Sequence, residues 1–199
     1  MRTTSRAITL SLSIDECRTL LEENTDLVQG LFRAILGDGA FVEQRTLLRG
    51  AGDASVAGMI GDGVSPVEKV LAMQRISTFA PMAADDLLHL ANIARRVSLD
   101  PKQPCYTRGD APTLTILLSG EVSLEAEGEA AIVANEGDAI GVIETLAGVP
   151  LGRTGRVLKP GAALVIAHDD LFDLLGQRPA LLQQLFSVLF GHRREVVAA

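Results

Sequence analysis

The chain has 199 residues, with 18 Lys and Arg against 25 Asp and Glu and a formal net charge of -7. This acidic balance argues against nucleic-acid binding, which needs a basic surface to neutralise phosphates. Two cysteines, Cys17 and Cys105, exclude a disulfide framework, and no apolar run reaches the roughly 18 residues that a membrane span needs. Hydrophobic residues make up 47% of the chain, so we expect a folded cytoplasmic protein without a membrane span in this chain.

The first 37 residues predict a strand followed by helices. Apolar and small polar residues alternate over residues 8–14, which is the period of a half-buried strand. Apolar residues then recur at helical spacing over residues 15–36, and Asn24-Thr25-Asp26 interrupts them, so a short helix and a longer one are expected.

Residues 38–64 differ from their surroundings in composition. Glycine and alanine crowd this stretch, in Gly37-Asp38-Gly39-Ala40 and again in Gly50-Ala51-Gly52-Asp53-Ala54, and no hydrophobic period holds. The composition predicts a linker that is flexible in its glycine-rich parts.

Residues 65–199 predict a mainly β domain with flanking helices. Ser65-Pro66-Val67-Glu68 fits a capping box with proline at the first helical position, and a second helix follows Pro81. Helical spacing returns after Asp169. Between the two helical regions, closely spaced strands with glycine-rich turns predict a β-roll or jelly roll. The expected strands are Val97–Leu99, Leu114–Leu118, Val122–Ala126, Ala131–Ala134, Gly155–Leu158 and Ala163–Ile166.

A repeat suggests how these zones are related. Residues 13–36 align without gaps on residues 167–190, and seven of the 24 positions are identical, where about one or two are expected by chance. Two amphipathic helices with leucine at core positions would also look alike. We favour a tandem arrangement, in which residues 1–37 are the remnant of a preceding copy and residues 65–199 form a complete one.

The turn residues sharpen this prediction into a family resemblance. Residues 67–195 resemble the cyclic-nucleotide-binding domains, the β-roll sensors of catabolite activators, kinase regulatory subunits and gated channels. The resemblance implies a β-roll with N-terminal helices and two C-terminal helices, and a regulatory, non-catalytic role. The matching stretches are Phe79–Leu87, Arg108-Gly109-Asp110-Ala111, Leu117–Val122 and Glu136–Gly141.

The family's phosphate-binding cassette predicts the ligand site, residue by residue. In the family it reads Gly-Glu-(Leu/Ile)-Ala-Leu, a few residues, then Pro-Arg-(Ala/Ser)-Ala; the helix N-terminus and the arginine hold the cyclic phosphate, and the glutamate holds the ribose. Here Val142 stands at the glutamate position and Leu151 at the arginine position. The candidate ligand-binding residues are Gly141, Val142, Ile143, Glu144, Leu151, Gly152 and Arg153.

Two readings of this altered cassette stay open. Arg153 lies two residues after Leu151, so on a strand its guanidinium would point the same way and could replace the missing arginine. Arg153 and Arg156 could equally form a solvated strand face, and Val142 and Leu151 could simply fill a disused pocket. Glu144 is a poorer substitute for the missing glutamate, because two residues along a helix turn a side chain about 200° away.

The sequence therefore predicts a regulatory domain and no enzyme. His89, His168 and His192 are isolated, which leaves a metal-binding jelly roll without ligands, and no cofactor is expected apart from cAMP or cGMP as a ligand. One hypothesis is a sensor of cyclic nucleotide or another small anion within a larger multidomain protein. The other is a degenerate copy that binds a neighbouring domain or forms a homodimer through the apolar face of its C-terminal helix. That face comprises Leu182, Leu185, Phe186 and Leu189.

Overall fold

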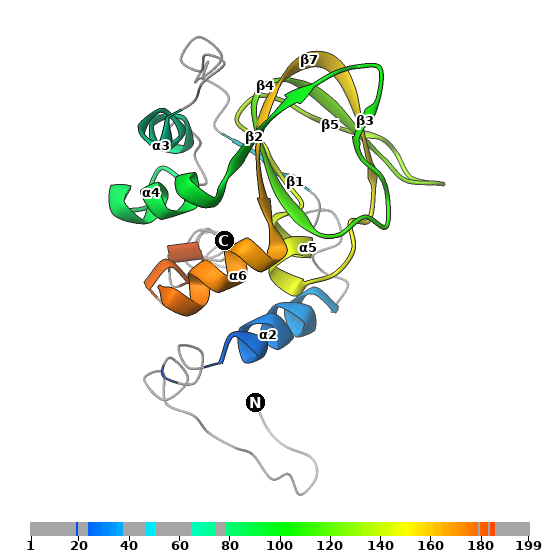
Figure 1. The fold of residues 1–199 in the computed structure, drawn as a ribbon. Helices are drawn as coiled ribbons and strands as arrows, with labels where there is room; N and C mark the ends of the chain where they lie inside the picture. The colour runs from blue at the N-terminus through cyan, green and yellow to red at the C-terminus, as the bar shows by residue number, and fades with distance from the viewer. Residues whose placement is uncertain are drawn as a thin grey trace, which may run out of the picture.

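The computed structural model describes residues 19, 24–37, 47–50, 65–74, 79–178, 180–182 and 184–185. Their centre is a seven-stranded antiparallel sheet in the order β1-β6-β4-β7-β2, with β3 paired to β7 and β5 paired to β4. The sheet curls into a roll, and helices lie along one side and below it (Figure 1). The strands are β1 (Leu47–Leu48), β2 (Arg95–Leu99), β3 (Pro104–Tyr106), β4 (Thr113–Glu125), β5 (Ile132–Ala134), β6 (Ala139–Ile140) and β7 (Thr154–Ala167).

The two long strands β4 and β7 bury side chains on both faces. Leu114, Ile116 and Leu118 point towards the helices, while Leu117 belongs to a second apolar cluster with Val122 and other residues of the roll. Because side chains alternate along a strand, Thr113 and Thr115 lie on the face of β4 opposite the helices. That face lines the interior of the roll.

The helices α3 (Pro66–Gln74) and α4 (Ala84–Ile93) pack against each other beside the sheet. The predicted capping box is confirmed: the Ser65 amide donates to Oε2 of Glu68 at 2.7 Å, and the Glu68 amide donates to Oγ of Ser65 at 3.3 Å. Hydrogen bonding of the Glu68 carboxylate to the backbone and the side chain of Ser65 lowers the pKa of Glu68 below its ordinary value.

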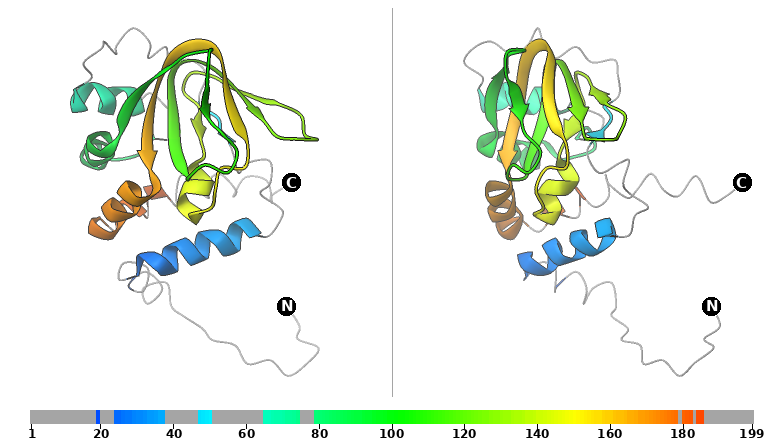
Figure 2. Two further views of the ribbon diagram at one scale, coloured as in Figure 1. Left: turned by 45° about the vertical axis from the view of Figure 1, so that its right-hand side comes forward. Right: turned by 90° about the vertical axis from the view of Figure 1, so that its right-hand side faces the viewer.

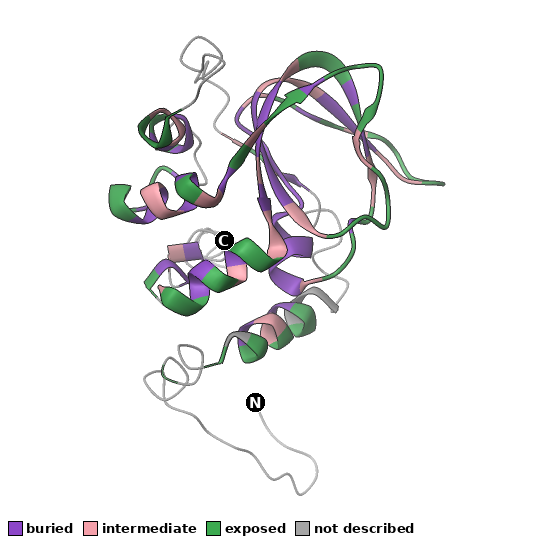
Figure 3. Cartoon of the chain, in the orientation of Figure 1, coloured by how far each residue is buried: buried purple, intermediate pink, exposed green. Residues whose placement is uncertain are grey.

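Three further helices form a layer at one end of the roll: α2 (Thr25–Gly37), α5 (Val142–Ala147) and α6 (His168–Gln177). All six residues of α5 are buried, and α5 lies between the sheet and α2 (Figure 3). Val28 and Phe32 of α2 are 2% and 1% exposed and belong to the same core as Leu146. The further views show α2 running beneath α5 and α6 (Figure 2).

Part of the predicted linker belongs to the sheet. Leu47 and Leu48, inside the segment predicted as a linker, pair with Ile140 and Ala139 as an edge strand, so the structure differs from that prediction at these two residues. The helix predicted after Asn24 is present as α2, whereas the strand predicted over residues 8–14 lies outside the described residues. Division of the chain into a remnant and a complete copy stays a prediction.

A buried carboxylate fixes the segment that follows β1. Asp138, 4% exposed, accepts hydrogen bonds from the amides of Gly50 at 2.8 Å and Asn135 at 2.9 Å, and pairs with the Arg49 guanidinium at 3.0 Å. A Cβ on Gly50 would lie 2.3 Å from the carbonyl oxygen of Gly137, so only glycine allows this close approach. Gly50 belongs to a segment whose composition predicts flexibility, but close packing requires a glycine at this position.

The predicted strands are confirmed in place but not in number. The strands expected at Leu114–Leu118 and Val122–Ala126 form one strand, β4, with Gly120 at φ +90° where the register with β7 shifts. Likewise Lys159-Pro160-Gly161 lies within β7 instead of ending it. Such irregularities bend a strand without breaking it, and they curl the sheet into the roll.

Candidate ligand cavity

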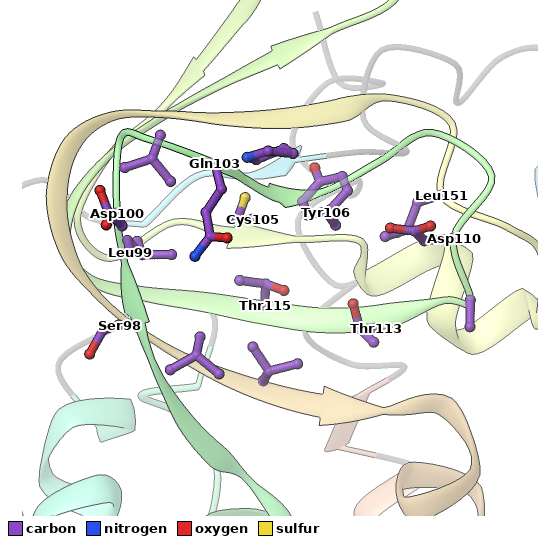
Figure 4. A pocket seen from close by; sticks show the side chains of 15 residues that line it. Ser98, Leu99, Asp100, Gln103, Cys105, Tyr106, Asp110, Thr113, Thr115 and Leu151 are labelled. Carbon is purple, nitrogen blue, oxygen red and sulfur yellow. The ribbon is translucent and has the colours of Figure 1, made fainter.

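A cavity of about 610 Å³ opens inside the roll, on the face of β4 away from the helices. Its walls come from β2, β3, β4 and β7, together with the loops that follow β2, β3 and α5 (Figure 4). Its apolar lining residues include Val97, Leu99, Val157, Val165 and Leu151. Its size is within the range of small-molecule binding sites, so this is the candidate functional site.

The charged groups of the cavity are carboxylates. Asp100 and Asp110 lie at opposite ends of it, with Thr113 and Thr115 along the wall between them (Figure 4). None of the 15 residues that line it, all within the described part of the chain, is Lys, Arg or His. An entering anion would therefore meet negative charge without a compensating cation.

Asp110 is held in a fixed orientation by the turn that precedes β4. Its carboxylate accepts hydrogen bonds from the amide and the hydroxyl of Thr107, at 2.7 Å and 2.8 Å. These bonds hold the pKa of Asp110 below its ordinary value, so the group is ionised at neutral pH. Asp100 accepts one such bond, from the amide of Lys102 at 3.0 Å.

Cys105 and Tyr106 of β3 form another part of the wall, and neither is activated. Burial raises the pKa of the Cys105 thiol to about 11, and the thiol donates to the carbonyl of Gly155 at 3.2 Å. Burial also raises the pKa of Tyr106. Both groups are protonated at neutral pH, which is unsuited to nucleophilic chemistry.

Gly141 connects the cavity wall to α5. It is the N-cap of α5 with φ 71° and ψ 13°, a left-handed conformation that favours glycine. A Cβ at this position would lie 2.4 Å from the carbonyl oxygen of Thr113 and 3.0 Å from a methyl group of Leu151, both in the cavity wall. A displacement of either wall residue therefore bears directly on the start of α5.

The structure separates the seven predicted site residues. Val142, Ile143 and Glu144 are buried in α5, at 5%, 8% and 6% exposure, and none of them lines the cavity. Leu151 is 3% exposed and does line it, while Gly152 is exposed beside it. Of the predicted residues, only Leu151 is part of the cavity, although Gly141 touches its wall.

The side chain of Arg153 is engaged in contacts outside the cavity. Its guanidinium forms an ion pair with Glu129 and donates to the carbonyls of Ala130 at 3.0 Å and Leu124 at 3.3 Å. Its side chain is 13% exposed and it does not line the cavity. These contacts tie the start of β7 to the β4–β5 hairpin, and they do not favour the replacement of a phosphate-binding arginine by Arg153.

The far end of α5 is tied to α2. The Arg33 guanidinium donates to the carbonyl of Ala147 at 2.7 Å, at the C-terminus of α5, where a cation is favourable. Nδ1 of His168 lies 2.7 Å from the carbonyl of Thr145 and must donate to it, so in the neutral ring Nε2 accepts from the Gln29 side chain at 3.0 Å. His168 therefore joins α2, α5 and α6.

A second polar network joins α4 to the segment after α6. Asp86, 7% exposed, accepts from the Gln184 side chain at 2.6 Å and from Arg178 at 3.2 Å. Arg178 also pairs with Asp85 at 2.6 Å, which lowers the pKa of Asp85.

Leu182 and Leu185, predicted to form a docking face, are 5% and 6% exposed within this chain's own core, so that prediction is wrong for these two residues. Phe186 and Leu189 lie outside the described residues.

The residues of the cavity that sequence reasoning missed include apolar strand residues, such as Val97 and Val165, and short polar strand residues, such as Thr113 and Thr115. The best signal for the polar ones is the spacing of Thr113 and Thr115 inside an otherwise apolar run, which places two hydroxyls on one face of β4.

Within the described ranges, no three or more His, Cys, Asp and Glu side chains are grouped so as to hold a metal ion. The described helices are all too short or too polar to cross a membrane.

Comparisons with known proteins place this fold. No protein-family model matches the sequence, and no curated protein does. Among solved structures, the N-terminal domain of a transcriptional regulator from Streptomyces coelicolor is 21% identical with a TM-score of 0.53, covering 61% of this chain and 89% of that one. A Ruegeria pomeroyi protein assigned as a cyclic nucleotide binding protein is 16% identical with a TM-score of 0.56, covering 65% of this chain and 60% of that one.

A third similar structure is the regulatory domain of Toxoplasma gondii PKA with cAMP. It is 18% identical with a TM-score of 0.51, and the match covers 63% of this chain and 49% of that one. These likenesses show that the chain has the β-roll fold of the cyclic-nucleotide-binding domains. The predicted fold class, a mainly β roll with flanking helices, is confirmed.

Proposed function

We propose that this chain is a non-catalytic regulatory domain, which senses a small molecule in the cavity of its β-roll and transmits occupancy through α5 to α2 and α6. The position of α5 carries the proposal. Its N-cap, Gly141, is in close approach to Thr113 and Leu151 of the cavity wall, and its C-terminal carbonyls accept hydrogen bonds from Arg33 and His168. A ligand that shifts the equilibrium between two positions of α5 would change the docking of both neighbouring helices.

The fold suggests cAMP or cGMP as the ligand, since a similar solved regulatory domain holds cAMP. The lining of this cavity weakens that suggestion. Leu151 offers no charge at the expected arginine position, and Arg153 is bonded to Glu129. We expect cyclic nucleotides to bind weakly here, because the phosphate lacks a charge-assisted hydrogen bond from this wall.

We place this domain in the cytoplasm as one part of a larger multidomain protein. The support is the likeness to regulatory chains of which it spans only part, 60% of the Ruegeria protein and 49% of the Toxoplasma protein. The tandem repeat in the sequence points the same way.

The second candidate function is a ligand-free module that acts through protein contacts. The carboxylates of the cavity and the apolar side chain of Leu151 favour it, since both suit a pocket that has lost its nucleotide. With Leu182 and Leu185 buried, its candidate surface is the exposed apolar face of α3, where Val67 and Leu71 are 62% and 41% exposed.

Hydrogen exchange followed by mass spectrometry tests the proposed transmission without any ligand. We expect Leu151→Ala to increase amide exchange not only in residues 108–111 but also in α5 and α2, because the support of Gly141 is lost. Val133→Ala, which trims a side chain 37% exposed on β5, is the matched control and should change none of these segments. An increase confined to residues 108–111 and 151 would contradict the proposal.

A further inference from the structure

The charges that line the cavity favour a positively charged ligand, whereas a phosphate site favours a negatively charged one. Its two ionisable carboxyl groups, Asp100 and Asp110, stand at its ends, and no cation is among its 15 lining residues, all of them described. Both carboxylates are exposed, so a phosphate beside either would meet a screened repulsion, whereas an ammonium group would gain a charge-assisted hydrogen bond there. A ligand with a donor at one end and an apolar body is therefore the complement of this lining.

Of the two carboxylates, Asp110 is the better prepared partner. Thr107 fixes it with two hydrogen bonds, so it loses little orientational freedom on binding. Its backbone carbonyl also accepts from the Leu151 amide at 3.1 Å, and the Gly109 amide donates to the carbonyl of Leu151 at 2.9 Å. A group held by Asp110 thus lies against the stretch of wall that supports Gly141.

We propose that the cavity binds a small, mainly apolar amine, with its ammonium group on Asp110 and its body against the apolar wall. The apolar wall consists of Val97, Leu99, Val157 and Val165. The hydroxyls of Thr113 and Thr115 offer further hydrogen bonds along the way. This inference rests on the proposed function, because it names the ligand class of the same cavity.

Three indole probes that differ only in their terminal group test the proposal: tryptamine, tryptophol and indole-3-acetate. Titration of the full chain, followed by calorimetry, should give affinities in the order amine, alcohol, acid, with tryptamine about tenfold or more tighter than indole-3-acetate. Asp110→Asn should lower the tryptamine affinity about threefold and leave that of tryptophol unchanged, because it removes the charge of an exposed carboxylate and keeps its shape.

Two variants locate the binding. Ala111→Trp places a bulky ring at an exposed position of the cavity lining and should abolish tryptamine binding without disturbing the core. Glu127→Gln removes an equal charge from the exposed β4–β5 turn and should leave the affinity unchanged. Equal loss in Asp110→Asn and Glu127→Gln would reduce the effect to net charge and overturn the proposal.

Different results would contradict the proposed ligand class and the proposed transmission through α5. Absence of binding by all three probes, equal binding of amine and acid, or binding that survives Ala111→Trp would each overturn the amine proposal. Micromolar binding of cAMP in the cavity would overturn it as well, yet leave the sensing role intact. Only the exchange response of α5 and α2 to Leu151→Ala bears on the transmission itself.

Discussion

Leu151→Arg is expected to raise the affinity for cAMP by about 10- to 100-fold over the unmodified chain. Leu151 lines the cavity next to the N-cap of α5, and its amide donates to the carbonyl of Asp110, so an arginine at this position starts from the cavity wall close to that residue. Its guanidinium would offset the carboxylate and supply the charge-assisted hydrogen bond that the present lining lacks. Calorimetric titration with cAMP and cGMP measures the gain.

The control for this prediction is Val133→Arg. It adds the same charge to an exposed position on β5, outside the cavity, and should give little gain. Equal affinity gains in the two variants would assign the effect to net charge, and no gain in Leu151→Arg, with the fold retained by circular dichroism, would contradict the assignment of this wall to the ligand site.

Asp138→Ala is expected to lower the free energy of unfolding by about 2–4 kcal/mol, since it removes the acceptor of two backbone amides in a buried setting. Those amides belong to Gly50 and Asn135, and the Arg49 guanidinium loses its ion pair at the same time. Denaturant unfolding followed by circular dichroism gives the magnitude. Hydrogen exchange should show the change concentrated in residues 47–50 and their partners in β6.

A matched variant, Asp173→Ala, removes an exposed carboxylate from α6 and should leave the free energy of unfolding nearly unchanged. If Asp138→Ala were as mild as Asp173→Ala, the segment 47–50 would not be held by this carboxylate. The prediction of a linker over residues 38–64 would then be the better interpretation of residues 47–50.

The sequence predicts the core of this fold because its hydrophobic periods are strong. The short apolar runs Leu114–Leu118 and Ala163–Ile166, bounded by turn residues, and the capping box at Ser65 are local signals that the structure bears out. Gly120 and the segment Lys159-Pro160-Gly161 predict turns that end strands, whereas in the structure they are irregularities within long strands. A bulge and a turn use the same residue types, so the sequence alone predicts too many strands here. Strand β1 was missed because only its partner β6 distinguishes two leucines in a glycine-rich stretch from a linker.

The site was harder to predict than the fold. The family motif points to Leu151, which lines the cavity, and to Gly141, which touches its wall. It cannot tell that Arg153 pairs with Glu129, since that contact depends on the β4–β5 hairpin brought alongside by folding. The charge of the cavity depends on Asp100 and Asp110, which come from separate loops. Their joint effect is visible only once the roll closes.

The most direct test of this account is a calorimetric titration of the 199-residue chain with cAMP and cGMP, repeated with Arg153→Ala. We predict no saturable binding in the micromolar range for either nucleotide, and no difference between the two proteins, because none of the described residues that line the cavity is a cation and Arg153 is bonded to Glu129. Micromolar binding that Arg153→Ala abolishes would contradict the account, since it would place the phosphate on that arginine and make the chain a cyclic-nucleotide sensor with a displaced ligand.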